Sequence, residues 1–156
     1  MTLRRATDTL LIHSTGTAPD VELTRREIDR QHRARGLLGI GDHWIIERYG
    51  ATERGRPENR VGLHCKLQGM NQRAISVRLV GGLWTPEGPL YTAAQWLSLR
   101  VLLKEIVGRW PSITTIGGPR DVLGSGADTS PGFDVADWLR REVPELARLE
   151  ALEKIT

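Results

Sequence analysis

The chain has 156 residues, of which 39% are hydrophobic and 26% are charged, as expected of one packed domain with a charged surface. Its single cysteine, Cys65, excludes an intrachain disulfide, and no apolar run is long enough to cross a membrane. The first residues lack the apolar core of a signal peptide, so we expect the protein to stay in the cytoplasm. The net charge of +3 is a modest excess, which favours neither a membrane nor nucleic acid as a partner.

A short apolar strand is predicted at residues 9–14, and it runs into a histidine. Leu11 and Ile12 precede His13, and a turn of small residues follows. A buried strand that ends in one polar side chain can present a metal ligand or a base at the edge of a sheet. The alternative is a core histidine that is satisfied by a hydrogen bond. The strand alone leaves both interpretations open.

The first predicted helix covers residues 24–35. Thr24 and Glu27 have the spacing of a capping box, in which each side chain bonds to the other residue's backbone amide. The outward positions are basic, which fits either a solvated face or a docking surface for an acidic protein partner. These basic positions are Arg25, Arg26, Arg30, Arg33 and Arg35.

The middle of the chain predicts a hairpin, a loop and a strand. Residues 42–56 have the alternation of a hairpin, with its turn at Gly50. Residues 61–64 are a short extended piece, and residues 66–71 are a predicted loop. Residues 74–80 alternate apolar and polar side chains, as a strand with one buried face does.

The last third predicts helices on either side of a short strand and an irregular loop. Thr92 begins a capping box, and Asp134 is a candidate cap for a later helix. Residues 113–116 are a predicted strand, and residues 117–132 a loop with little regular structure. Pro144 opens a predicted C-terminal helix whose apolar stripe would pack on the body or on another subunit. The stripe consists of Leu146, Leu149, Leu152 and Ile155.

Three segments, in order, resemble the zinc-dependent N-acetylmuramoyl-L-alanine amidases of the phage-lysozyme and peptidoglycan-recognition type. They are residues 11–15, residues 41–56, and residues 61–82 with Asn71 among them. The helix at Thr92 and the ending at residues 131–134 follow in the family's order. Each motif is weak alone, but the ordered set is specific.

The resemblance covers about residues 7–140 and implies an α/β fold, with a mixed central β-sheet flanked by helices. It also implies a groove across one face for glycan and stem peptide. We therefore expect an amidase-like domain over residues 1–142 and a helical extension over residues 143–156.

Enzymes of this family hydrolyse the amide that joins the lactyl group of muramic acid to L-alanine. A zinc ion on three protein ligands activates water, and a tyrosine and a lysine assist. His13 matches the first ligand, but Pro119 and Ser130 stand at the other two positions. Asp42 replaces the tyrosine, and Asp128 replaces the lysine. Proline has no donor atom for zinc, and a neutral serine hydroxyl is a poor ligand.

We therefore expect a degenerate amidase with no intact catalytic set, no metal, and a groove that still binds a peptidoglycan fragment or another ligand. The resemblance implies that the groove residues are His13, Asp42, His64, Asn71, Asp128 and Ser130.

Two alternatives remain open. One is an active N-acetylmuramoyl-L-alanine amidase with a rearranged metal site of His13, His64 and Asp128, from which His43 would point away. The other is a phage structural or regulatory protein, which would contact a host partner through the basic first helix or the C-terminal helix. The resemblance to small phage amidases implies a phage or prophage gene and a bacterial host cell.

Overall fold

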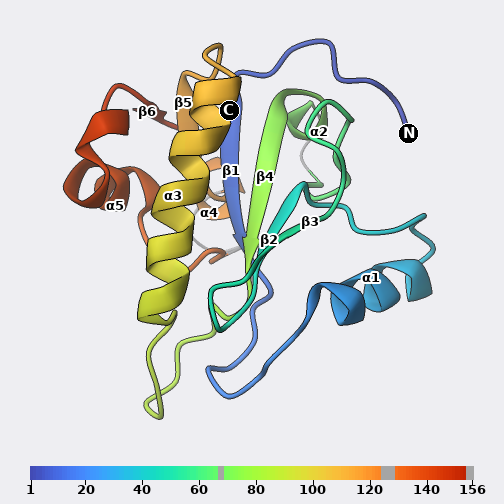
Figure 1. The fold of residues 1–156 in the computed structure, drawn as a ribbon, viewed down its shortest axis with the longest axis vertical. Coiled ribbons are helices and arrows are strands. Elements are labelled where there is room, and N and C mark those ends of the chain that lie inside the picture. Colours follow the sequence, from blue (N-terminus) through green and yellow to red (C-terminus); the bar gives the residue numbers. More distant parts are fainter. Residues whose placement is uncertain (67–68, 124–128, 154–156) are drawn as a thin grey trace.

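Two central parallel strands, β1 and β4, organise a mixed sheet with helices on both of its faces (Figure 1). The computed structural model describes residues 1–66, 69–123 and 129–153. Across the sheet the described strands follow the order β3-β2-β4-β1-β5-β6. The β2–β3 pair is antiparallel, and every other neighbouring pair is parallel. The strands are β1 (Thr9–Ser14), β2 (Trp44–Ile46), β3 (Thr52–Arg54), β4 (Ala74–Leu79), β5 (Thr115–Gly117) and β6 (Glu150–Ala151).

The helices begin where their caps predict. Both capping boxes form, at Thr24 and at Thr92, and the Asp134 side chain caps the later helix. None of the helices in the described part of the chain is long and apolar enough to span a membrane. The helices are α1 (Arg25–Ala34), α2 (Met70–Arg73), α3 (Ala93–Arg109), α4 (Pro119–Leu123) and α5 (Val135–Glu142), followed by the 3₁₀ turn η1 (Pro144–Leu146).

Strand alternation divides the sheet into an apolar face and a partly polar face. Leu10 and Ile12 of β1 lie in the main core, beneath α3 and α5. Leu11 belongs to a smaller cluster on the opposite face, where α2 and α4 pack. His13 points to that same face, and it pairs in register with Arg78 of β4. The polar side chains of the two central strands are thereby placed together.

The described residues 143–153 contain a 3₁₀ turn and a short strand and no α-helix, which corrects the prediction of a helical extension over residues 143–156; residues 154–156 lie outside the described part. Pro144 opens a single 3₁₀ turn, after which the chain becomes β6 and pairs in parallel with β5. The amide of Glu150 donates to Thr114 O at 2.9 Å. The unpaired backbone groups at the edge of β5 thus bind this segment as a strand, and it does not form a helix. Leu146 and Leu149 are buried in the main core and Leu152 packs against the smaller cluster, so these three leucines pack on the protein's own body; Ile155 lies outside the described residues.

Two predicted loops contain short helices instead. Residues 66–71 include the start of α2, and residues 117–132 include α4. Pro119 begins α4, where its missing amide hydrogen is not needed, and Asp121 accepts a hydrogen bond from the amide of Gly118 at 2.7 Å. Asp128 lies outside the described residues.

Candidate functional site

A groove of about 720 Å³ lies at the carboxyl ends of the parallel strands β1, β4 and β5. Ligands of open α/β sheets usually bind at this edge. We call one side the histidine wall, formed by His13, Asp42, His64 and Arg78, and the other the proline wall, formed by Pro119 and Ser130. The described lining consists of His13, Ser14, Thr15, Gly16, Arg35, His64, Cys65, Lys66, Arg78, Gly82, Leu83, Pro119, Leu123, Thr129 and Ser130.

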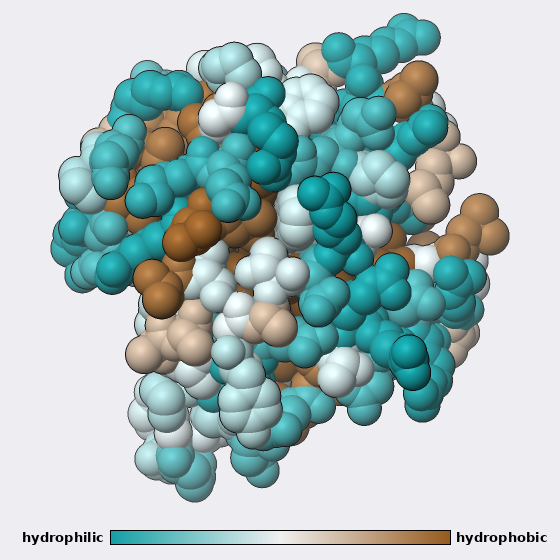
Figure 2. Space-filling view, in the orientation of Figure 1, coloured by the Kyte–Doolittle hydropathy of each residue, from teal (hydrophilic) through white to brown (hydrophobic). Residues whose placement is uncertain are grey.

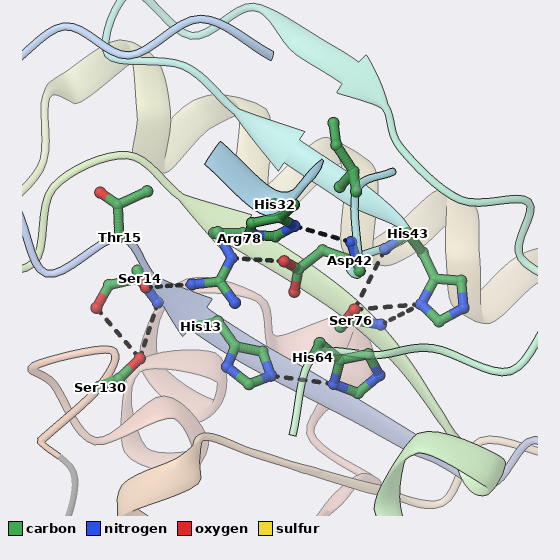
Figure 3. A network of polar contacts seen from close by, with 12 residues as sticks. His13, Ser14, Thr15, His32, Asp42, His43, His64, Ser76, Arg78 and Ser130 are labelled. Atoms are coloured by element: carbon green, nitrogen blue, oxygen red, sulfur yellow. Dashed lines mark hydrogen bonds and ion pairs between the residues drawn. The ribbon is translucent and has the colours of Figure 1, made fainter. Parts of the chain in front are cut away.

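Two imidazoles meet at the floor of the groove. Nε2 of His13, at the end of β1, lies 3.2 Å from Nδ1 of His64 (Figure 3). His64 is held in place by Asn71, whose Oδ1 accepts hydrogen bonds from the amides of His64 and Cys65, each at 3.0 Å. Asn71, predicted to contact the ligand, thus positions the segment that carries His64.

Close packing against a glycine fixes the His64 ring from behind. A Cβ atom at Gly62 would lie 2.4 Å from Nε2 of His64 and 3.2 Å from Cε1 of His43. No side chain fits in that space. Nε2 of His64 is buried there without a hydrogen-bond partner.

A buried ion pair lies beside the two imidazoles. Nε of Arg78 donates to Oδ2 of Asp42 at 2.5 Å, and Nη1 donates to Ser14 O at 2.7 Å. Burial disfavours the charged carboxylate, but the charge of Arg78 and its hydrogen bond hold the pKa of Asp42 well below its usual range. Oδ1 of the fully buried Asp42 has no hydrogen-bond partner.

The histidines of this region are neutral at pH 7. Burial lowers the pKa of His13 to about 3 and that of His43 to about 4. Burial likewise lowers the pKa of His64 well below its ordinary value. A neutral imidazole can accept a hydrogen bond or bind a metal ion.

His43 lies on the same side of the sheet as Asp42, so the prediction that the two residues point to opposite faces is wrong. Nδ1 of His43 accepts a hydrogen bond from the amide of Ser76 at 3.0 Å, and its ring centroid lies 5.6 Å from that of His64. Because β2 begins only at Trp44, strand alternation does not apply to the residues before it.

The proline wall does not fit zinc at the positions that the resemblance implies. Pro119 is buried at the start of α4, and its side chain has no donor atom. Oγ of Ser130 accepts hydrogen bonds from the amide of Ser14 at 2.8 Å and from its hydroxyl at 3.1 Å. Ser130 thus secures the end of β1. Only His13 keeps a ligand function among these three positions.

The structure brings a different trio together. His13, Asp42 and His64 each offer a potential ligand atom, and these atoms lie within 4.8 Å of one another. The rearranged site predicted from the sequence had Asp128 as its carboxylate, and Asp128 lies outside the described residues, so that prediction stays untested; among the described residues, Asp42 is the carboxylate beside the two histidines. Sequence reasoning also missed Arg78 as a groove residue, although its alternation with Val77 and Leu79 placed it on the polar face.

The amino-acid sequence matches one protein family along most of its length. A model of N-acetylmuramoyl-L-alanine amidases matches residues 3–133. The endolysin of Escherichia phage T7 is 35% identical over 138 residues, which cover 86% of this chain and 87% of the relative. The chain belongs to the N-acetylmuramoyl-L-alanine amidase family. The endolysin of Enterobacteria phage K11 is 33% identical and covers 89% of each chain.

Two solved structures share the fold of this chain. The amidase LysC from Clostridium intestinale superposes with a TM-score of 0.73 at 29% identity, covering 88% of this chain and 85% of that one. Drosophila PGRP-LB superposes with a TM-score of 0.71 at 20% identity, covering 96% and 88%, which shows the fold alone. The predicted fold class, a mixed sheet flanked by helices, is confirmed.

Proposed function

We propose that this amidase-family protein binds a muramyl-peptide fragment of peptidoglycan in its groove and does not hydrolyse it through the family's zinc positions. The observation that carries the proposal is the charge of the groove. Two cationic side chains, Arg35 and Lys66, line it, and the described lining contains no acidic residue. Arg78 also lines the groove, but it is paired with Asp42, which is fully buried. Stem peptides carry free carboxylates, which guanidinium and ammonium groups bind well.

The scaffold around the groove is intact while the family's ligand positions are not. Ser130 accepts a hydrogen bond from the Ser14 amide at the end of β1, and Pro119 begins α4. A groove with these residues can contact a peptide, but it lacks the family's three-ligand set for activating water. The names of the relatives, which are endolysins and muramoyl-alanine amidases, support peptidoglycan as the ligand class.

Titration calorimetry with an N-acetylmuramoyl tripeptide tests this proposal. We expect the wild-type chain to bind it, and Arg35→Ala and Lys66→Ala each to weaken binding by about threefold to tenfold, as loss of one charged contact does. Arg30→Ala is the matched control, because Arg30 is an exposed arginine of the same helix that does not line the groove. Absence of binding by the folded wild type, or equal losses in Arg30→Ala, contradicts the proposal.

A second candidate function is amidase activity with a rearranged metal site. The proximity of His13, Asp42 and His64 favours it, since two histidines and a carboxylate are a ligand set of catalytic zinc. Incubating the protein with purified sacculi, with and without added Zn²⁺, separates the two functions. Release of stem peptides that depends on His64 supports the enzyme; binding to sacculi with no release supports the groove-binding proposal.

A further inference from the structure

A buried carboxylate oxygen without a donor lies at the floor of the groove. Asp42 is fully buried and ionised, and only its Oδ2 is bonded, to Arg78. Its Oδ1 points toward the gap between the rings of His13 and His64 (Figure 3). Leaving a buried charged oxygen unsatisfied is costly, so such an atom calls for a partner.

The two imidazole nitrogens have the spacing of ligands on one ion. Nε2 of His13 and Nδ1 of His64 are 3.2 Å apart. Two nitrogens bound to tetrahedral Zn²⁺ at about 2.0–2.1 Å lie about 3.3 Å from each other. The third ligand atom, from Asp42, lies within 4.8 Å of both. Side-chain movements on the order of 1 Å bring it to bonding distance.

A hydrogen bond between the imidazoles does not satisfy this cluster. Only one proton fits between Nε2 of His13 and Nδ1 of His64, and it leaves Oδ1 of Asp42 with nothing to accept. A divalent cation would use both nitrogen lone pairs and the carboxylate oxygen at once. Arg78 would then be the outer partner that orients the ligating carboxylate through Oδ2, an arrangement common around metal sites.

We propose that His13, His64 and Asp42 bind one Zn²⁺ ion at the floor of the groove. The site shares only His13 with the positions that the family resemblance implies. Nε2 of His64 lacks an outer partner, which typically lowers metal affinity by about 10-fold to 100-fold. We therefore expect micromolar affinity, and we expect the groove side of the ion to be open to water or ligand, because His13 and His64 line the groove.

Metal titration of the full chain tests the site. After treatment with EDTA and buffer exchange, the wild type should bind one Zn²⁺ per chain in titration calorimetry. His64→Ala and Asp42→Asn should each weaken binding at least about 10-fold. Asp29→Asn, which alters a carboxylate of α1 outside the cluster, should bind as the wild type does.

Co²⁺ absorption provides a second measurement that needs no variant. The wild type should give the visible bands of a tetrahedral ion without a thiolate charge-transfer band, because the cluster contains no sulfur ligand. This readout stands even if Asp42→Asn does not fold. A thiolate band that disappears in Cys65→Ser would overturn the assignment.

Three other results would also overturn it. They are a folded wild type that takes up no Zn²⁺ at about 1 mM, unchanged affinity in both His64→Ala and Asp42→Asn, and an equal loss of binding in Asp29→Asn. The site does not depend on peptidoglycan binding. Muropeptide binding without Zn²⁺ uptake removes this inference alone, and Zn²⁺ uptake without muropeptide binding removes the proposed function alone.

Discussion

The two walls of the groove are polar in different ways. On the histidine wall, Asp42 and Arg78 form a buried ion pair, and two neutral imidazoles lie beside it. On the proline wall, Ser130 makes neutral hydrogen bonds to Ser14, and Pro119 offers only carbon. The candidate metal ligands and the buried ion pair therefore lie on one side of the groove, and the described contacts of Ser130 on the other side are neutral hydrogen bonds.

The largest expected effect is on the histidine wall. Asp42→Ala leaves the mostly buried guanidinium of Arg78 without its partner, so we expect a loss of about 3 kcal/mol in the free energy of unfolding, measured with urea. Asp29→Ala is the control, because its pair with Arg33 is exposed and should contribute about 0.5 kcal/mol or less. Equal effects of the two variants would refute the contrast between buried and exposed pairs.

The second-largest expected effect is a gain in zinc affinity when ligand residues are placed on the proline wall. In a His64→Ala background, Pro119→His with Ser130→Cys restores the family's ligand types around His13, and we expect zinc affinity to rise about 100-fold over His64→Ala alone. Alanine at both positions, in the same background, is the control. A folded repaired variant with no gain would show that our positional match between residues 117 and 132 is wrong.

A smaller effect is expected for Ser130→Ala. The variant removes the acceptor of the Ser14 amide hydrogen and should reduce the free energy of unfolding by about 1.5 kcal/mol, measured with urea. Ser98→Ala, which loses a hydroxyl bond to Gly50 O, gives a comparison within the same protein. A loss as large as that of Asp42→Ala would mean that the proline wall is held as strongly as the histidine wall.

The smallest expected effect is a pH dependence of stability that comes from His32, whose side chain bonds to the backbone just before Asp42. Nδ1 of His32 accepts a hydrogen bond from the amide of Gly41 at 3.0 Å, and burial lowers the pKa of His32. Because the folded pKa is below the unfolded value of 6.5, the unfolded chain binds more protons, and stability falls as the pH drops below about 6.5.

Asparagine at position 32 keeps an acceptor but does not titrate. Between pH 7.5 and 5.5 we expect the wild type to lose more of its free energy of unfolding than His32→Asn does, measured by urea unfolding at each pH. Parallel pH profiles for the two proteins would show that His32 does not contribute.

The fold could be predicted where its cause is local. The capping boxes at Thr24 and Thr92 and the alternation of β4 depend on neighbouring residues, and the structure confirms them. The C-terminal prediction failed because the leucine stripe fits a helix locally, whereas the outcome depends on the distant edge of β5. Side-chain periodicity carries no information about a free strand edge elsewhere in the chain.

The site, like the fold, could be predicted where it depends on neighbouring residues and could not where it depends on distant ones. His13 could be found from its position at the end of a strand, and the missing ligands at Pro119 and Ser130 from the family's order. The meeting of Asp42 with His64 depends on the irregular backbone before β2 and on the loop held by Asn71, which no spacing rule describes. Arg78 could have been predicted as a groove residue, because alternation along β4 puts it on the polar face.

Gly62 gives this wall a signature that can be recognised in other sequences. Any side chain there would push the His64 ring out of its place, so a relative with a larger residue at this position would need a different arrangement of its histidine. We expect relatives that have a glycine two residues before this histidine, and an aspartate in place of the family's tyrosine, to have room for the same arrangement of the ring.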